Sequence, residues 1–290
     1  YHSKEIMLCF IVNKHCRNLL IPLCEQLSQK FTDIKSFVMN INSQNTNVIM
    51  GENNKTLLGK DCIYDIMCGN RISLSPHSFY QVNTEQAEKL YGIAAEYANL
   101  SGSETVMDLY CGAGTIGLSV ADKAKSILGV EVIPQAVENA KENALNNSIT
   151  NTDFICDDAG NAAKKLSETQ KPDIVIVDPP RKGCDINTLE AIVEMSPTKV
   201  IMISCNPATG ARDCKFLSEN GYEIKRIRGV DLFPRTTHVE TVVLLSKLES
   251  KQRIEVNLNM DELDLTAAES KATYDEIIAY VLKTTGLKVS

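Results

Sequence analysis

Two features are missing from this 290-residue chain, and each absence excludes a class of protein. No apolar run reaches the roughly 20 residues needed to cross a bilayer, and no basic-then-apolar leader occurs, so we predict no membrane association. The ten cysteines include no C-x-x-C pair. Zinc-ribbon and thioredoxin-like sites therefore find no support, and we predict no metal site. We expect the cysteines to be reduced thiols, as in a cytoplasmic protein.

An excess of positive charge is also missing, because the formal net charge is -7. Phosphate contacts need Lys and Arg, so this charge disfavours indiscriminate nucleic-acid binding. Basic residues do gather in the second half of the chain, namely Arg181, Lys182, Arg212, Lys215, Lys225, Arg226, Arg228 and Arg235. Their distribution fits a local cleft for an anionic substrate, and it fits charges on a solvated surface equally well.

The pattern over residues 1–75 predicts a small α+β domain. Strand-like runs at 5–12 and 34–41 flank a helical pattern at 19–31. Residues 56–75 then predict a short antiparallel meander.

Residues 76–248 predict a second, larger domain. A long amphipathic helix at 78–100, with Asn83 and Thr84 as candidate caps, opens this region. Strands and helices then alternate, with strands expected at 105–110, 126–132, 152–156, 172–178, 199–205, 222–230 and 238–247. These strands are apolar throughout, which is typical of a parallel sheet covered by helices on both faces. The last strand follows a short connection with no room for a crossover helix, so we expect it to be antiparallel.

Residues 249–290 are acidic and polar at first and then show a helical pattern at 273–284. We expect this segment to be an appendage to the second domain, and we assign it no function.

A glycine-rich segment, "DLYCGAGTIG" (108–117), lies between a predicted strand and a predicted helix. It contains G-x-G-x-x-G, and Glu131 follows about twenty residues later at the end of the next strand. Both a dinucleotide and S-adenosylmethionine bind to such loops, because glycines allow close approach and a carboxylate accepts ribose hydroxyl groups. The loop alone leaves a dehydrogenase and a methyltransferase equally open.

Two carboxylates favour the methyltransferase. Asp108 brings negative charge into the glycine loop, which suits a cationic sulfonium with its ammonium group better than a pyrophosphate. Asp178 ends the fourth strand of the larger domain in the segment "IVIVDPPRKG" (174–183), at the edge where open α/β sheets bind ligands.

A thiol and a further carboxylate are expected at the same edge. Cys205 ends the fifth strand, and Glu240 begins the antiparallel last strand. An isolated buried cysteine is usually a small hydrophobic residue. Beside a methyl donor, however, a thiol and a carboxylate suit carbon methylation of a pyrimidine. The thiolate adds at C6, C5 attacks the methyl group, and a base removes the C5 proton. We expect positive charge nearby, such as Arg181, to increase the thiolate fraction of Cys205.

Five motifs together resemble one known family. They are "SFYQVN" (78–83), "DLYCGAGTIG" (108–117), "VDPPRKG" (177–183), "ISCNPAT" (203–209) and "DLFPRTTHVE" (231–240). In order and spacing they are similar to the bacterial RNA (uracil-5-)-methyltransferases, which make 5-methyluridine in ribosomal or transfer RNA. The resemblance covers roughly residues 5–247.

The resemblance implies a Rossmann-like, seven-stranded class I methyltransferase domain preceded by a small central α+β domain. It implies that Cys205 is the nucleophile and Glu240 the proton acceptor. It also implies that Gln81, Tyr110, Glu131 and Asp178 contact S-adenosylmethionine. The implied partner is structured RNA, with 23S ribosomal RNA as the first candidate and transfer RNA as the alternative. Family members usually begin with an RNA-binding β-barrel, the TRAM domain, and many carry an iron–sulfur cluster. Neither pattern occurs here, so we expect the chain to be a fragment of a longer protein.

Three other functions stay open on the residues alone. An amino-group methyltransferase could use the Asp-Pro-Pro turn, although such sites usually place an aromatic residue after the prolines, where this chain has Arg181. A nicotinamide-dependent dehydrogenase could use the glycine loop. A non-catalytic RNA-binding module is disfavoured by the negative net charge.

Overall fold

The computed structural model describes residues 1–44, 48–169 and 171–248. Its strands are β1 (Ile6–Val12), β2 (Ile34–Ile41), β3 (Asn53–Gly59), β4 (Ile63–Met67), β5 (Asn70–Leu74), β6 (Thr105–Leu109), β7 (Ser126–Glu131), β8 (Thr152–Cys156), β9 (Ile174–Val177), β10 (Lys199–Ser204), β11 (Tyr222–Val230) and β12 (Glu240–Lys247). Its helices are α1 (Arg17–Lys30), α2 (Thr84–Ala98), α3 (Thr115–Val120), α4 (Pro134–Asn146), α5 (Ala159–Ser167), α6 (Ile186–Met195) and α7 (Pro207–Glu219), with a short 3-10 helix η1 (Ala121–Lys123). The appendage and the helix predicted at 273–284 lie outside the described residues.

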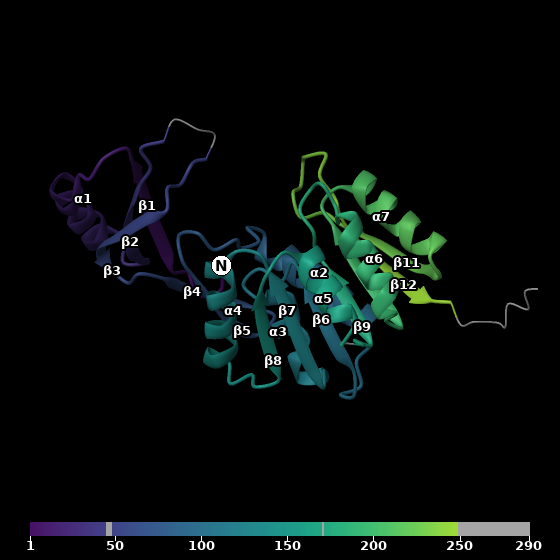
Figure 1. Cartoon of the computed structure of the whole chain (residues 1–290). Coiled ribbons are helices and arrows are strands. Elements are labelled where there is room, and N and C mark those ends of the chain that lie inside the picture. The colour runs from purple at the N-terminus through teal and green to yellow at the C-terminus, as the bar shows by residue number, and fades with distance from the viewer. Residues whose placement is uncertain (45–47, 170, 249–290) are drawn as a thin grey trace, which may run out of the picture. The chain divides into compact units, whose positions relative to one another are not determined.

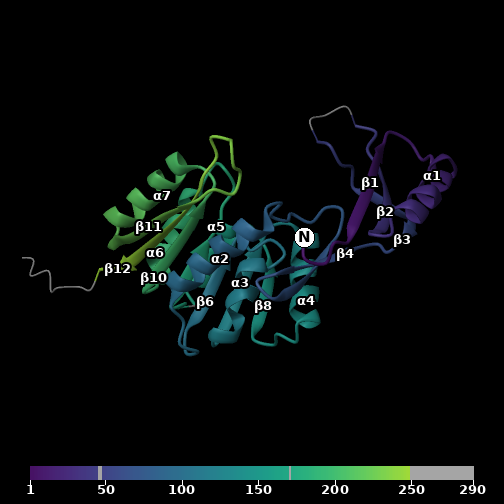
Figure 2. The ribbon, with the colours of Figure 1, turned by 180° about the vertical axis from the view of Figure 1, so that it is seen from behind.

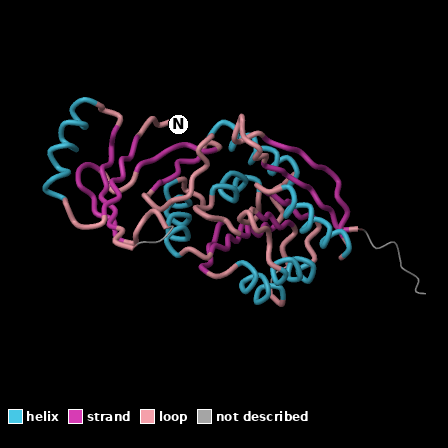
Figure 3. The backbone as a smooth tube through the Cα atoms, turned by 90° about the horizontal axis from the view of Figure 1, so that it is seen from above, coloured by secondary structure: helices cyan, strands magenta, loops and turns pink. Residues whose placement is uncertain are grey.

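The first 60 residues form a three-stranded sheet in the order β1-β2-β3, with helix α1 running alongside its strands (Figure 3). Strands β1 and β2 are parallel, and β3 is antiparallel to β2. Side chains of α1 and the sheet bury a small core around Cys24, Phe37, Met39 and Leu57. The strand–helix–strand prediction for this region is confirmed.

The predicted meander over residues 56–75 is wrong. Strand β3 pairs with β2, while β4 and β5 form a separate two-stranded hairpin. Gly59 ends β3 in the left-handed region, at φ +79°, close to the carbonyl oxygen of Lys35. Strand β3 therefore forms its hydrogen-bond ladder with β2, which precedes it at a distance in the sequence, and not with β4 as the local spacing predicted. The chain leaves the three-stranded sheet at Gly59.

The rest of the described chain is built on a seven-stranded sheet in the order β11-β12-β10-β9-β6-β7-β8 (Figure 1). Neighbouring strands are parallel except where β12 lies between β10 and β11, and β12 is antiparallel to both. The predicted Rossmann-like sheet and its antiparallel last strand are confirmed.

Helices cover both faces of this sheet, as the ribbon shows from front and back (Figures 1 and 2). Residues of α2, α3 and α4 pack with one face, and residues of α5, α6 and α7 pack with the other. In β9, Ile174 and Ile176 face the first cluster, whereas Val175 and Val177 face the second, and all four are at most 1% exposed. Each such burial contributes about 1.5–3 kcal/mol, which explains why this strand is apolar throughout.

Helix α2 begins six residues later than the predicted start at residue 78. Asn83 is its N-cap, and its side chain accepts a hydrogen bond from the backbone N–H of Gln86 at 3.3 Å. The predicted cap is therefore confirmed, and the residues before it, including Gln81, form a loop. The hairpin β4–β5 contacts α4, since the backbone N–H of Ser73 donates to Asn143 Oδ1 at 2.7 Å.

Candidate active site

Four of the predicted site residues lie at one edge of the seven-stranded sheet because of strand direction. Parallel strands β6, β9 and β10 end at this edge, where Tyr110, Asp178 and Cys205 directly follow them. Antiparallel strand β12 begins there with Glu240. Since Ser204 pairs with Thr241, the next residue outward on β10 is Cys205 and the next on β12 is Glu240. The predicted meeting of this thiol and this carboxylate at one edge is confirmed.

The carboxyl group of Glu240 is enclosed by protein, with only 5% of the residue exposed. Burial raises its pKa above the ordinary glutamate value, while the positive charge of Arg181 acts in the opposite direction. A carboxylate with a raised pKa is a stronger base than one in water, so Glu240 suits the removal of a proton.

The thiol of Cys205 is half-buried, and its pKa is raised. Burial is the main cause, and the negative charges of Glu240 and Asp178 add to it. Arg181 lowers the pKa, as expected, but its effect is outweighed. The expected direction of the Arg181 effect is therefore confirmed, although burial and the two carboxylates raise the pKa of the thiol overall. Sequence spacing did not show how closely the two carboxylates approach the sulfur.

Asp108 and Asp178 are two more carboxyl groups near this edge whose pKa values are raised. Burial raises the pKa of Asp108 to about 7, and the negative charges of Asp178 and Glu131 add to the increase. Burial also raises the pKa of Asp178, with the charge of Glu240 as the second cause.

Asp108 also orders the glycine loop. Its Oδ2 accepts a hydrogen bond from the backbone N–H of Gly117 at 3.0 Å, and a Cβ atom at Gly117 would lie 3.1 Å from that same oxygen. The other oxygen, Oδ1, is buried and has no hydrogen-bond partner among the described residues. A buried carboxylate oxygen without a donor is costly, so the site fits a ligand that brings a cation or an N–H group.

Glu131 also contacts the loop. Its two oxygens accept hydrogen bonds from the backbone N–H groups of Gly112 at 3.0 Å and Ile133 at 2.9 Å. These contacts hold the carboxylate against the start of the G-x-G-x-x-G segment. That is the position expected for the acidic residue of a nucleoside-binding loop.

Tyr110 and Gln81 are the remaining predicted cofactor residues. Tyr110 adopts a left-handed backbone conformation, at φ +65°, which is rare for a large side chain and often marks a functional site. Its hydroxyl group lies 3.2 Å from Thr188 Oγ1 and 3.5 Å from Asp185 Oδ2, so its side chain is directed towards the start of α6. Gln81 is 9% exposed in the loop before α2.

One residue near Asp178 was not among those predicted from the sequence. Tyr91 of α2 is 4% exposed, and burial raises its pKa, with a further increase from the nearby charge of Asp178. In the sequence Tyr91 is one apolar position of an amphipathic helix, and no motif distinguishes it from a core residue.

Two cavities lie away from the thiol and the carboxylate. One, of about 500 Å³, lies between the turn of hairpin β4–β5 and the end of α4. The other, of about 320 Å³, lies between α7 and strands β11 and β12 and includes Ser204 and Pro207 beside Cys205. Neither is lined by Cys205 or Glu240. Strand register brings these two residues to the same edge of the sheet.

All ten cysteines fall within the described residues, and all are free thiols, as expected. Over 1–44, 48–169 and 171–248, no group of three or more His, Cys, Asp and Glu side chains could hold a metal ion. The helices of the same residues are all too short or too polar to cross a membrane.

Strand order, glycine loop and acidic edge together define a Rossmann-like methyltransferase domain. Comparison with known proteins agrees. The sequence model of the tRNA (Uracil-5-)-methyltransferase family matches residues 23–248. The chain belongs to this family.

Individual relatives are similar over the same region. An uncharacterized RNA methyltransferase of Bacillus cereus is 46% identical over 84% of this chain and 54% of its own length. One of Staphylococcus aureus (strain MSSA476) is 44% identical over 85% and 54%. The chain thus spans about half the length of these curated relatives. Among solved structures, the Pyrococcus abyssi tRNA (uracil-54, C5)-methyltransferase in complex with S-adenosyl-L-homocysteine has a TM-score of 0.68 and 29% identity, over 83% of this chain and 56% of that one.

Proposed function

We propose that this chain carries the active site of an enzyme that methylates C5 of a uridine in structured RNA and uses S-adenosylmethionine as methyl donor. The observation that carries the proposal is the register of β10 and β12, which puts Cys205 and Glu240 at one edge beside Asp178. Family membership supports this reaction, and we predict a cytoplasmic location from the reduced cysteines.

The acidic edge supports the proposed cofactor. Asp108, Asp178 and Glu131 lie close enough for their charges to interact, and Oδ1 of Asp108 is without a partner among the described residues. A cationic cofactor with an ammonium group would relieve both costs. We assign cofactor contacts to Gln81, Tyr110, Glu131 and Asp178. The P. abyssi relative, which was solved in complex with S-adenosyl-L-homocysteine, supports this class of cofactor. Bound there, the cofactor supplies an electrophilic methyl group on sulfur.

Cys205 and Glu240 divide the remaining chemistry. The Cys205 sulfur, as thiolate, bonds to C6 of the uracil, and the electron pair of the C5–C6 double bond makes C5 nucleophilic. C5 takes the methyl group as the bond from sulfur to the methyl carbon breaks, and S-adenosylhomocysteine is left as the second product. The Glu240 carboxylate then removes the C5 proton, the C5–C6 double bond re-forms, and the thiolate leaves. The raised pKa of Glu240 suits this last step, and the positive charge of Arg181 favours the carboxylate form.

We propose ribosomal RNA, 23S in particular, as the first candidate substrate. Transfer RNA is the second candidate, and the name of the matching family and that of the P. abyssi relative favour it. An amino-group methyltransferase is a less favoured alternative, because its chemistry needs neither Cys205 nor Glu240.

Tritium release tests the reaction. RNA transcripts of 23S and of transfer RNA sequence, labelled with tritium at C5 of uridine, should release tritium to water with the wild-type chain, whereas Cys205→Ala should reduce release to background. S-adenosylhomocysteine should bind both proteins equally in calorimetry. Cys156→Ala is the control, since Cys156 also ends a parallel strand, β8, but this strand lies four positions from β10 in the strand order. Undiminished release by Cys205→Ala would refute the proposal. Nucleoside mass spectrometry of both RNA classes from cells lacking the protein then decides between the substrates.

A further inference from the structure

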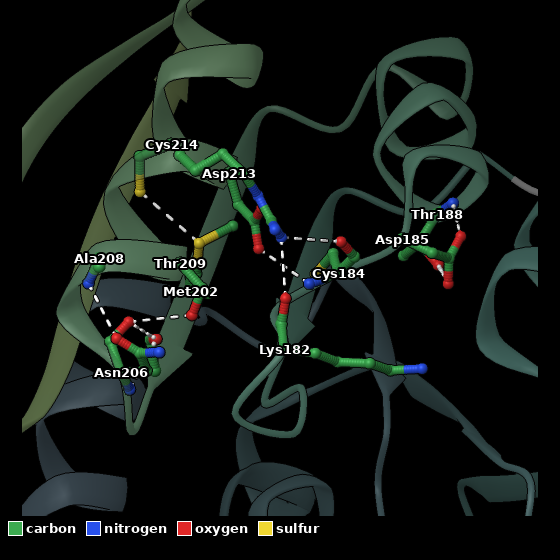
Figure 4. A network of polar contacts seen from close by, with 12 residues as sticks. Lys182, Cys184, Asp185, Thr188, Met202, Asn206, Ala208, Thr209, Asp213 and Cys214 are labelled. Atoms are coloured by element: carbon green, nitrogen blue, oxygen red, sulfur yellow. Dashed lines mark hydrogen bonds and ion pairs between the residues drawn. The ribbon is translucent and has the colours of Figure 1, made fainter.

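Side chains at helix α7 hold the loop that follows Asp178-Pro179-Pro180, through hydrogen bonds to the backbone of the loop (Figure 4). The carbonyl oxygen of Arg181 accepts hydrogen bonds from Asn206 Nδ2 at 3.3 Å and from Thr209 Oγ1 at 3.2 Å. Both donors lie at the start of α7, directly after Cys205. We call Asn206, Thr209, Arg212 and Asp213 the α7 clamp.

Arg212 and Asp213 hold the next part of the loop. Arg212 Nη2 donates to the carbonyl oxygens of Lys182 at 3.0 Å and Cys184 at 3.1 Å. Asp213, which is completely buried, accepts from the backbone N–H of Cys184 at 2.8 Å through Oδ2 and from Arg212 Nε at 2.8 Å through Oδ1. A buried carboxylate is expensive unless all its partners are in place, so this pair specifies one position of the loop.

Gly183 shows how closely the loop approaches the helix. It has φ +78°, and a Cβ atom there would lie 2.5 Å from both Arg212 Nη2 and Asp213 Oδ2. Only glycine allows this contact, because any side chain would push the loop away from the clamp.

The clamp connects the nucleophile with the proposed cofactor residues. Helix α7 begins at Pro207, and the N-cap Asn206 accepts from the backbone N–H of Ala208 at 3.1 Å, so the turn that carries Cys205 moves with the helix. The clamped loop starts after Asp178 and ends at Asp185, which caps α6 and lies beside the Tyr110 hydroxyl.

We propose that Arg212 and Asp213 are positioning residues that hold the 181–185 loop, and Arg181 with it, in fixed register with Cys205. This inference rests on the proposed function for its catalytic meaning, but the geometry it describes can be tested without RNA or cofactor. The charged groups that face the Cys205 thiol are Glu240 of β12, Asp178 after β9 and Arg181 of the clamped loop. Of these three charged groups, Arg181 is the one that favours the thiolate, so a loosened loop weakens the charge that opposes the two carboxylates.

The test is the pH profile of Cys205 alkylation by iodoacetamide, followed by peptide mass spectrometry, with the exposed Cys156 as internal reference. Arg212→Met and Gly183→Ala should each move the profile to higher pH and slow alkylation at pH 7.5 by about 3- to 10-fold, since one pKa unit is a tenfold change in thiolate. Thr209→Val, which removes one donor and is the mildest change, should act in the same direction by a smaller factor. Arg212→Lys should not keep the wild-type profile, because one ammonium group cannot replace the planar guanidinium that donates to both the loop and Asp213.

Arg212→Met and Gly183→Ala each have a matched control. Lys215→Met removes the same charge one turn further along α7, where the side chain pairs only with Glu219 in the described chain. Gly221→Ala introduces an alanine at φ +95° with no atom within 4 Å. Both controls should keep the wild-type profile. Wild-type profiles in Arg212→Met, Gly183→Ala and Thr209→Val would overturn the inference, even if their melting temperatures fall, since loss of stability alone does not move the titration of Cys205. A shifted profile in a protein that methylates no uridine would instead support the clamp and contradict the proposed function.

Discussion

Replacing Asp108 by asparagine tests the electrostatics of the acidic edge. The carboxyl group is 1% exposed, and its pKa rises from 3.8 to about 7 on folding. A shift of about 3 units corresponds to about 4 kcal/mol, at about 1.4 kcal/mol per unit. A raised folded pKa means that this stability is present below the unfolded pKa, near pH 4, and is lost as the pH rises through 7. Wild-type protein therefore pays the full cost of the buried charge above pH 8.

The asparagine side chain keeps an oxygen to accept from the N–H of Gly117 and carries no titrating proton. We expect Asp108→Asn to be more stable than wild type at pH 8.5 and to lose most of that advantage at pH 4.5, a difference of the order of 4 kcal/mol. Urea unfolding at both pH values measures it, and Asp122→Asn, at an exposed position, is the control. Parallel stability curves for wild type and Asp108→Asn would refute the assignment of a buried, high-pKa carboxyl group. The same variant should bind S-adenosylmethionine more weakly, because a negative charge near the cationic group is lost.

Two more variants separate the roles at the edge. Glu240→Gln should form the covalent Cys205–RNA adduct but release tritium about 10²- to 10⁴-fold more slowly, the usual contribution of a general base, so adduct should accumulate on denaturing gels; tritium release at the wild-type rate would remove Glu240 from the proposed step. Tyr110→Phe should lower the free energy of unfolding by about 1 kcal/mol in urea titrations, because the contacts of its hydroxyl with Thr188 and Asp185 are lost, while S-adenosylhomocysteine affinity stays within about threefold. A large loss of affinity would instead show that the hydroxyl itself binds the cofactor.

The seven-stranded sheet and the edge position of Cys205 and Glu240 could be predicted because they depend on strand direction. Apolar runs such as β9 locate the strands, and the short connection before β12 determines its antiparallel direction. Once these are known, every strand end is assigned to an edge without knowledge of any side-chain contact.

Features that depend on distances between elements could not be predicted. The partner of β3 is β2, and paired residues are separated by 12 positions (Ile41 with Asn53) to 23 positions (Ser36 with Gly59), and nothing in residues 56–75 indicates it. The pKa of Cys205 depends on the approach of Asp178 and Glu240 relative to that of Arg181. Asp213 looks like a surface residue beside Arg212 in an ordinary helix, although it is completely buried. Only the packing of α7 against the loop distinguishes it.

The position of β12 also determines the order in which this sheet can be completed during protein synthesis. Strand β12 is the last of the described strands to leave the ribosome, yet it lies between β10 and β11. Until it arrives, β11 has no neighbour in the sheet, and the side of β10 away from β9 offers unpaired backbone groups. A nascent chain that stalls before residue 240 would expose this open strand to other chains, so the juxtaposition of Cys205 with Glu240 and the protection against aggregation are acquired in a single late step.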